Sequence, residues 1–383
     1  MSKKNKKTKN TKKKQKNNIE KISNTNNKTN IKQIIICFLL SRLILVLFLI
    51  INKDLSIFEL YDSIHYINMA EHGYIEEYLY AFFPLYPILI KILSIIIPSF
   101  HISGALISNI CSFLSLLILN ELTKENQNKF NIICFTFSPI LAFSSIVYTE
   151  SLFMLLTLLG FYLYKKDKYL LSGIVVGLSI LTRNSGIILW GAIGLDMLYR
   201  FFIKKDKDFK FKNILIFGIT SLLIGMIYPL YLYIKTGNFL EFATVQDKYW
   251  NRLNGTFIHG IINDIKVIIR SSGARLFNII IFLENWISFI ITFILGIKIF
   301  KKDKVSSIYI IVSLIAFTIT YRDINYWQTL SSISLFRYIF NLFPIYIYLL
   351  NNKKKNTNIL IFMIFLLLSL YNTLLVYSGA FIA

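Results

Sequence analysis

"FFPLYPILIKILSIIIP", residues 82–98, is the stretch that decides how this chain is threaded through a membrane. It is almost as long and as apolar as a transmembrane helix, which needs about 20 residues to cross the hydrocarbon core. It also contains Pro84, Pro87 and Lys91. Because proline removes a backbone donor and kinks a helix, we predict a re-entrant or membrane-surface segment here instead of a span.

The composition places the chain among polytopic membrane proteins. Of its 383 residues, 55% are hydrophobic and 16% are charged, whereas in soluble domains about a quarter of the residues are charged. The net charge of +22 is typical of nucleic-acid-binding proteins, but twelve lysines lie in residues 1–32, among Asn, Thr and Ser. We therefore predict a disordered basic cytoplasmic tail over 1–32, with attraction to anionic lipid and RNA binding as lesser alternatives. We expect no nucleic acid as the functional partner.

The rest of the chain, 33–383, is predicted to form one all-α transmembrane domain. Apolar runs of sufficient length indicate eleven spans. They cover 33–51, 103–122, 130–147, 150–165, 169–184, 187–203, 213–234, 276–298, 305–321, 335–350 and 358–378.

The distribution of lysine and arginine indicates the orientation of these spans. With the N-terminal tail inside, the inner loops are 123–129, 165–168, 204–212, 298–304 and 351–356, and every one of them is basic. The opposite side receives 52–102, 236–275, 322–334 and the tight turns near 148 and 185, which are mixed or acidic. Counting 82–98 as a span would reverse the later loops and violate the positive-inside rule, so we prefer eleven spans.

The first outer loop, 52–102, contains the stretch "YDSIHYINMAEHGY", residues 61–74. Long loops inside compact proteins tend to be functional. A helix over 62–72 would place Asp62, His65 and Met69 on one face, and Gly73 would end it. The competing interpretation makes Asp62 only an N-cap and His65 a surface residue.

Three further ionisable residues lie at the predicted outer ends of spans: Glu150, Arg183 and Arg337. The structural alternative for Glu150 and Arg183 is stabilisation by the helix dipole, and an arginine can also extend to the headgroups. Arg337 lies near a helix start, where the dipole disfavours a cation. Ionisable groups within spans usually face an interior site. Together, these residues suggest a carboxylate base working beside a bound anion, because arginine suits phosphate.

Other motifs carry weaker signals. Cys37, Cys111 and Cys134 lie in apolar runs without metal-ligand or disulfide spacing. Asp206-Lys207-Asp208 is formally the D-x-D pattern of nucleotide-sugar transferases, but it lies among lysines on the predicted inner side. "NGT", 254–256, is a glycosylation sequon in an outer loop. We expect no cleavable signal peptide, no bound metal and no other cofactor.

Six blocks of the chain, taken in order, resemble the PIG-V-like mannosyltransferases, a family within the GT-C glycosyltransferase superfamily that includes GPI mannosyltransferase II. The blocks are "YDSIHYINMAEHGY" (61–74), "FFPLYPILIKIL" (82–93), "SPILAFSSIVYTESLFMLLTLLGFYL" (138–163), "GLSILTRNSGIIL" (177–189), "FATVQDKYW" (242–250) and "SLFRYIFNLFPIY" (334–346). The resemblance runs from about residue 40 to 350. It departs from the family at Tyr61, where the family usually has Trp.

The resemblance implies a GT-C-type membrane enzyme that moves mannose from a polyprenyl-phosphate carrier to an acceptor on the outer or lumenal face. Asp62 matches the acidic residue of the first loop that acts as catalytic base, and His65 matches the accompanying histidine. Glu150 is the next candidate for the base. The expected substrate-binding residues are Arg183, Asn184, Gln246, Trp250, Arg337 and Tyr338. The enzyme would belong to a plasma membrane in a prokaryote and to the endoplasmic reticulum in a eukaryote.

The residues themselves support an inverting reaction. No nucleotide sugar is available outside the cell, so the donor must arrive activated through the membrane, and a lipid phosphate provides a good leaving group. Asp62 would take the acceptor proton, and Arg183 or Arg337 would hold the phosphate. A transporter or flippase of a lipid-linked sugar, and a GT-C enzyme that uses another sugar, remain the alternatives. The acceptor is open: a glycolipid, a glycan or a protein.

Overall fold

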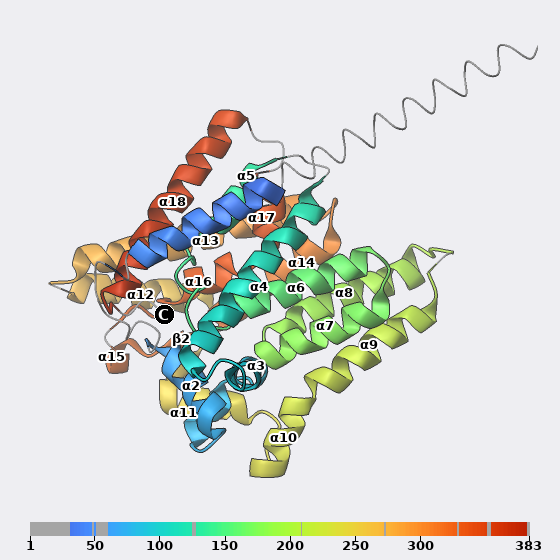
Figure 1. Cartoon of the computed structure of the whole chain (residues 1–383), viewed down its shortest axis with the longest axis horizontal. Coiled ribbons are helices and arrows are strands. Elements are labelled where there is room, and N and C mark those ends of the chain that lie inside the picture. Colours follow the sequence, from blue (N-terminus) through green and yellow to red (C-terminus); the bar gives the residue numbers. More distant parts are fainter. Residues whose placement is uncertain are drawn as a thin grey trace, which may run out of the picture.

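The computed structural model describes residues 31–47, 50, 60–124, 128–207, 209–271, 273–327, 329–350 and 354–380, and these residues are mostly helical (Figure 1). The predicted tail lies outside the described residues except for residues 31 and 32, which already belong to the first helix.

The elements follow one another as a series of helices with two short strands. They are a helix over 31–47, α2 (Asp62–His72), the 3₁₀ helix η2 (Glu77–Ala81), α3 (Leu85–Ser94), α4 (Phe100–Thr123), α5 (Phe130–Thr136), α6 (Glu150–Lys165), α7 (Tyr169–Thr182), α8 (Gly186–Leu198), the π-helical turn η4 (Tyr199–Ile203), α9 (Phe211–Gly225), α10 (Ile227–Thr236), α11 (Glu241–Trp250), β1 (Arg252–Asn254), α12 (Phe257–Arg270), α13 (Arg275–Ile299), α14 (Lys304–Ile319), β2 (Thr320–Arg322), α15 (Ile324–Trp327), α16 (Leu335–Phe340), α17 (Pro344–Tyr348) and α18 (Lys355–Tyr377).

Five helical segments in the described part of the chain are long and apolar enough to cross a membrane. They are Phe100–Thr123, Gly186–Ile203, Phe211–Thr236, Arg275–Ile299 and Lys355–Tyr377. Leu85–Ser94, Tyr169–Thr182 and Lys304–Ile319 are shorter apolar helices. The prediction of a mostly helical membrane protein is therefore confirmed, whereas the count of eleven spans is not.

Two of the predicted spans are broken helices. In place of a span over 130–147, α5 ends at Thr136 and a series of turns leads to Glu150, and in place of a span over 335–350 the chain forms the short helices α16 and α17. Pro139 follows the end of α5 and Pro344 begins α17, and proline is incompatible with a helix interior. Both stretches are buried almost throughout, as non-helical backbone at membrane depth must be. They are apolar because they form the protein core.

The stretch 82–98 does not form a full span. Its helix, α3, has 10 residues and begins after Pro84, which is half the length needed to cross a bilayer. This agrees with the prediction from Pro84, Pro87 and Lys91.

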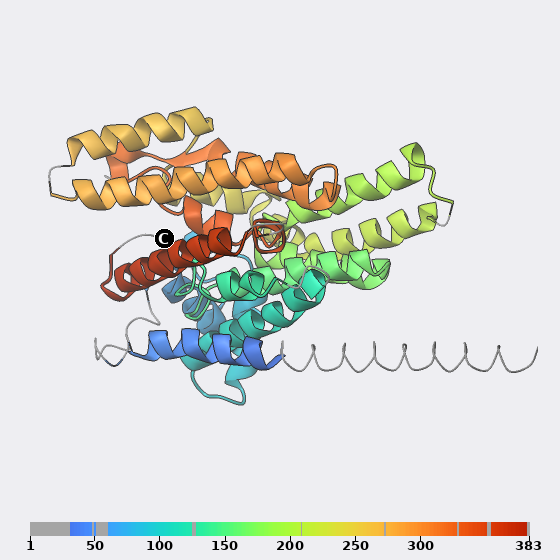
Figure 2. The same cartoon turned by 90° about the horizontal axis from the view of Figure 1, so that it is seen from above.

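The helices pack as a broad assembly. In Figure 1, α6, α7, α8 and α9 lie together on one side and α12 lies on the other, while α14 packs against both α13 and α8. Figure 2 shows α12 and α13 at one edge and the helix over 31–47, drawn in blue, at the opposite edge. α7 and α9 approach each other closely: a Cβ on Gly173 would lie 2.0 Å from Thr220 Oγ1, and one on Gly177 would lie 2.9 Å from the Ser221 carbonyl. Small residues four apart allow such close approach.

The only regular sheet in the described residues joins two loops that are far apart in sequence. β1 pairs antiparallel with β2, and Arg252 lies opposite Arg322. Asn251, with a φ of 46°, turns the chain from α11 into β1, and asparagine tolerates this left-handed conformation better than most residues. Its carbonyl accepts a hydrogen bond of 3.1 Å from the Asp323 N–H.

Candidate active site

The acidic residue of the first loop lies at the start of α2. The helix runs from Asp62 to His72 and ends at Gly73, as predicted. Its N-cap is Tyr61, which has a φ of 52° and makes no side-chain capping hydrogen bond. The interpretation of Asp62 as only an N-cap is therefore wrong. The Asp62 N–H donates to the Tyr148 hydroxyl at 3.1 Å, and the carboxylate is left to face Arg337.

Four ionisable residues from separate parts of the sequence form a continuous ion-pair chain: Asp62, Arg337, Glu150 and Arg183. Arg337 Nη1 lies 3.4 Å from Asp62 Oδ2, and Arg337 Nε lies 3.3 Å from Glu150 Oε1. The same Glu150 oxygen accepts a hydrogen bond of 2.7 Å from Arg183 Nη1. The structure therefore brings together four of the residues that the sequence singled out one by one.

The two ends of this ion-pair chain differ in exposure from its middle. The Arg337 and Glu150 side chains are 4% and 1% exposed, whereas Arg183 is 18% and Asp62 31% exposed. A buried charge costs several kcal/mol unless it is paired, so each inner member depends on its neighbours. The four charges sum to zero when all are ionised. Of the two carboxylates in this ion-pair chain, Asp62 is the one that solvent reaches.

Aromatic rings surround the two guanidinium groups. The Tyr338 ring centroid lies 5.1 Å from the Arg183 guanidinium carbon and 5.2 Å from that of Arg337. Arg337 also lies 5.3 Å from the Tyr148 ring and 5.5 Å from the Phe143 ring. Such cation–π contacts are strongest away from water. Tyr338 was predicted; Tyr148 and Phe143 were not, although both belong to the block that contains Glu150.

A buried carboxylate on α12 holds the turn that precedes α16. Asp264 is 0% exposed and accepts hydrogen bonds from the Ser331 N–H (2.7 Å), the Ser331 hydroxyl (2.7 Å), the Ser332 N–H (3.2 Å) and Trp286 Nε1 (3.0 Å), as well as from the Ser332 hydroxyl. Burial raises the pKa of Asp264, and the hydrogen bonds from Ser332 and Ser331 oppose that rise. Sequence reasoning missed this residue. Its signal is an acid on the buried face of an amphipathic helix.

Asn285 of α13 completes this support. Its amide nitrogen donates to the Ser332 carbonyl at 2.7 Å, and its amide oxygen accepts from the Phe336 N–H at 2.8 Å. Because Phe336 directly precedes Arg337, Asn285 and Asp264 together determine where the Arg337 side chain begins.

His65 lies in an aromatic cluster one turn along α2 from Asp62. Its ring centroid is 4.8 Å from Phe82, 5.4 Å from Tyr78 and 6.4 Å from Trp250. Burial lowers the pKa of His65, and the charge of Asp62 partly offsets this, so burial favours the neutral imidazole. No hydrogen bond joins His65 to Asp62 in the part of the chain that the structure describes. Trp250, a predicted substrate-binding residue, reaches this cluster from the end of α11.

The two remaining predicted residues lie outside the ion-pair chain. Gln246 is half-buried on α11, and Asn184 is exposed in the turn that follows Arg183. The D-x-D stretch belongs to the opposite side of the sequence-based topology. There Asp206 pairs with Arg200 at 3.2 Å, and Asp208 lies outside the described residues. Among the described residues, no group of three or more His, Cys, Asp or Glu could hold a metal ion.

Comparison with known proteins gives both sequence and structural matches. The profile of the family described as Mannosyltransferase (PIG-V) matches residues 36–249. GPI mannosyltransferase 2 of Yarrowia lipolytica is 30% identical over 145 residues, which cover 37% of this chain and 40% of that protein. GPI mannosyltransferase 2 of Candida albicans is 28% identical over 238 residues, covering 53% and 59%, and that of Schizosaccharomyces pombe is 26% identical over 215 residues, covering 50% and 46%.

Two crystal structures of the Archaeoglobus fulgidus oligosaccharyltransferase, in the apo form and in complex with zinc and sulfate, superpose on the chain with TM-scores of 0.45 and 0.47. Their sequence identities are 12% and 14%, and the matches cover 89% and 90% of this chain and 56% and 52% of theirs.

The chain spans about half the length of the curated relatives it matches. The family match includes Asp62, Glu150 and Arg183, whereas Arg337 lies beyond its end. Since this match covers more than half of the 383 residues, the chain belongs to the PIG-V mannosyltransferase family.

Proposed function

We propose that the protein is a membrane-embedded mannosyltransferase that transfers mannose from a polyprenyl-phosphate carrier to an acceptor hydroxyl on the outer or lumenal face, with inversion at the anomeric carbon. Membership of the PIG-V family supports the sugar and the reaction class. The observation that carries the mechanism is the position of Asp62 as the exposed carboxylate of a buried ion-pair chain.

Asp62 acts as general base in this proposal. Its carboxylate takes the proton of the acceptor hydroxyl, the hydroxyl oxygen forms a bond to C1 of the sugar, and the C1–O bond to the phosphate breaks. The electron pair of that bond leaves with the phosphate. Arg337 Nη1 lies 3.4 Å from Asp62 Oδ2, so this oxygen faces the guanidinium group and the other carboxylate oxygen is left for the acceptor. A positioned general base contributes typically 10² to 10⁴ in rate.

Glu150 serves as a positioning residue in this scheme. It is 1% exposed and contacts both Arg183 and Arg337, so it directs the two guanidinium groups. Arg183, with 18% of its side chain exposed, is the more accessible arginine of the pair. The role of Glu150 as an alternative base stays a prediction.

The cluster around His65 is proposed to receive a sugar. Phe82, Tyr78 and Trp250 present aromatic faces and edges beside a neutral imidazole, and apolar sugar faces pack on such rings. Gln246 on the same helix as Trp250 and Asn184 beside Arg183 would supply hydrogen bonds to sugar hydroxyls. His65 is then a substrate-orienting residue.

We propose a GT-C-type fold with the topology inferred from the basic loops. α2, α11, β1 and β2 then lie on the outer side, with 351–356 in the cytoplasm. The host membrane would be the endoplasmic reticulum in a eukaryotic cell and the plasma membrane in a prokaryotic one. Cysteines introduced at Glu77 and Lys354 should react with an impermeant reagent from opposite sides. Labelling of both from one side would refute this topology.

Mannose transfer tests the function directly. Purified protein is given radiolabelled polyprenyl-phosphate-mannose and a membrane extract, and the labelled product is identified. We expect mannose to appear on a lipid, glycan or protein acceptor, with the configuration at C1 inverted. If labelled donor crosses a proteoliposome membrane without any transfer, the protein is a flippase. If only another polyprenyl-phosphate sugar is used, the assignment of mannose is wrong.

A further inference from the structure

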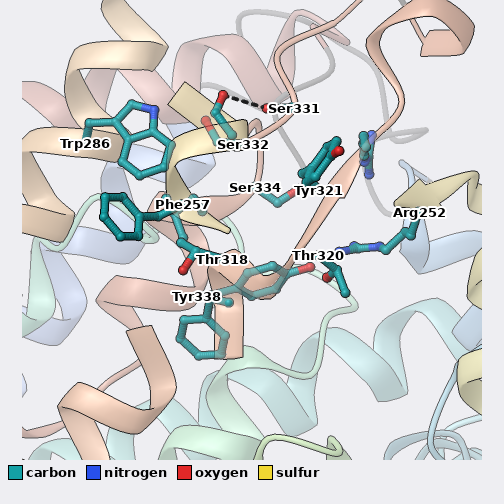
Figure 3. Close-up of a pocket in the computed structure, with 14 residues that line it drawn as sticks. Arg252, Phe257, Trp286, Thr318, Thr320, Tyr321, Ser331, Ser332, Ser334 and Tyr338 are labelled. Atoms are coloured by element: carbon teal, nitrogen blue, oxygen red, sulfur yellow. Dashed lines mark hydrogen bonds between the residues drawn. The ribbon is translucent and has the colours of Figure 1, made fainter. Parts of the chain in front are cut away.

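A pocket opens beside the ion-pair chain, and the proposed mechanism does not use it. It lies between β1, β2 and the helices α12, α13 and α16 (Figure 3). Its empty volume is about 440 Å³, a figure that includes the open solvent at its mouth. Of the described residues that line it, the charged ones are Arg252 and Arg322. The pocket is therefore basic.

The sheet register places the two arginines side by side. Arg252 and Arg322 are direct partners across an antiparallel pair, so their side chains leave the same face with Cβ atoms about 5 Å apart. Like charges in this position destabilise a sheet. Arg322 is 8% exposed, and its pKa is lowered to about 10 by burial and by the charge of Arg252. An anion between the two guanidinium groups would remove this repulsion.

Polar groups that point into this region lack protein partners. Ser334 is 6% exposed, and its hydroxyl has no hydrogen-bond partner in the described part of the chain. The same holds for the buried Nε of Arg252. Buried donors left unsatisfied cost about 1–3 kcal/mol each. Thr320 adds a further hydroxyl on the face of the sheet that carries the arginines. This set of donors suits an oxyanion with several acceptor oxygens.

Tyr338 joins the pocket to the proposed reaction centre. It lines the pocket, while its hydroxyl lies 3.3 Å from Arg337 Nη2. Figure 3 shows Tyr338 and Arg252 extending toward each other across the pocket, with Thr320 close by. The ion-pair chain is neutral as a whole, so it attracts an anion weakly, whereas the arginine pair adds two positive charges next to it. Only the Tyr338 side chain would separate a phosphate held in this pocket from the ion-pair chain that contains Asp62.

We propose that this pocket is a phosphate-binding subsite in which Arg252, Arg322 and Ser334 hold the phosphate of an amphiphilic substrate while its sugar faces Asp62. The assignment to the polyprenyl-phosphate donor rests on the proposed function. Asp264 positions the pocket wall through Ser331 and Ser332 without contacting the ligand.

Binding measurements on the full chain in maltoside micelles test this subsite, because such micelles contain no phosphate. The probes are radiolabelled polyprenyl monophosphate and polyprenol of the same length, which lacks the phosphate. The variants are Arg252→Gln, Arg322→Gln, the double variant and Arg252→Lys, with Arg270→Gln as matched control. Arg270 is an exposed arginine at the end of α12 and does not line the pocket.

We expect each arginine-to-glutamine change to weaken polyprenyl phosphate binding about tenfold or more and the double variant to lose more. Arg252→Lys should retain part of the affinity, and binding of polyprenol should not change in any variant. Wild-type affinity in Arg252→Gln/Arg322→Gln would refute the proposal. If Arg322→Gln fails to fold, Arg252→Gln alone decides, because Arg252 lies at the half-buried rim.

Competition identifies the source of the phosphate. An excess of phosphatidic acid that displaces the polyprenyl carrier as well as unlabelled carrier does would assign the subsite to a phospholipid headgroup and refute the donor assignment. The outcome is separable from the proposed function. Arginine-dependent binding without any sugar transfer would refute the function and keep the subsite. Sugar transfer together with binding that does not depend on the two arginines would keep the function and refute the subsite.

Discussion

Asp62 and Asp264 are two aspartates on the same predicted side of the membrane, and their surroundings differ sharply. Asp264 is completely buried and receives five hydrogen bonds from Trp286, Ser331 and Ser332. Asp62 is 31% exposed, and its carboxylate is approached only by Arg337 among the described residues, at 3.4 Å and 3.5 Å.

The difference supports the proposal that Asp62 is the reactive carboxylate and that Asp264 is a structural one. A carboxylate whose lone pairs are all occupied has no capacity to accept a proton without breaking hydrogen bonds. Asp62 keeps that capacity, because one cation holds it from one side and solvent reaches the other. Both aspartates act on Arg337: Asp264 through the backbone of the preceding turn, and Asp62 through its side chain.

Removing Arg337 should have the largest effect. In Arg337→Met, Asp62 loses its partner and buried Glu150 loses one of its two cations, which should destabilise the fold by about 3–5 kcal/mol. Thermal unfolding of the purified variants measures this. Arg270→Met, at an exposed position, should unfold as wild type. Adding Glu150→Gln should restore part of the lost stability. If Arg337→Met is as stable as wild type, the ion-pair chain does not hold the site together.

Replacing Asp62 should separate activity from stability. Asp62→Asn keeps the size of the side chain but cannot accept the proton, so turnover should fall about 100-fold or more while the unfolding temperature barely moves. Mannose transfer in matched membranes gives the measurement. Glu71→Gln, an exposed acid on the same helix, should transfer at the wild-type rate. Near-normal turnover in Asp62→Asn would remove this residue from the mechanism and turn attention to Glu150.

The reverse pattern is expected for Asp264. Asp264→Asn places an NH₂ group among donors, and one unsatisfied buried group costs about 1–3 kcal/mol. We expect a lower unfolding temperature with nearly unchanged turnover per folded molecule. Asp247→Asn, at an exposed position on α11, serves as control. If Asp264→Asn stays stable but loses turnover as Asp62→Asn does, Asp264 takes part in the reaction and the two aspartates do not differ in role.

His65 should give the smallest effect and a pH signature. Its pKa is lowered from 6.5 in the folded state, so the unfolded chain binds a proton at a higher pH than the folded protein does. Stability should therefore fall as the pH drops below about 6.5. His65→Gln should lack this part of the pH dependence and lose turnover less than tenfold. If the unfolding curves of His65→Gln and wild type respond to pH identically, the burial of His65 does not contribute to the pH dependence of stability.

The sequence was sufficient to predict several features. The apolar runs predicted a helical membrane protein, Pro84 and Pro87 predicted that 82–98 is no span, and Gly73 predicted the end of α2. Asp62, Glu150, Arg183 and Arg337 could be singled out because ionisable groups are rare in apolar surroundings and stand out against them. Hydropathy failed at 130–147 and 335–350, since lipid and protein core select the same apolar side chains and only a break such as Pro139 or Pro344 tells them apart.

Local sequence thus determined which ionisable groups are unusual in this apolar chain. A charged side chain among apolar neighbours is costly to bury, and this can be recognised from the neighbouring residues alone. Tertiary structure alone decided which groups meet. Asp62 and Arg337 are separated by most of the chain and come together through the turns that Asp264 and Asn285 hold. Arg252 and Arg322 become neighbours only through the pairing of β1 with β2. Such long-range pairings have no local signature, because the free energy that favours them comes from partners that are distant along the sequence.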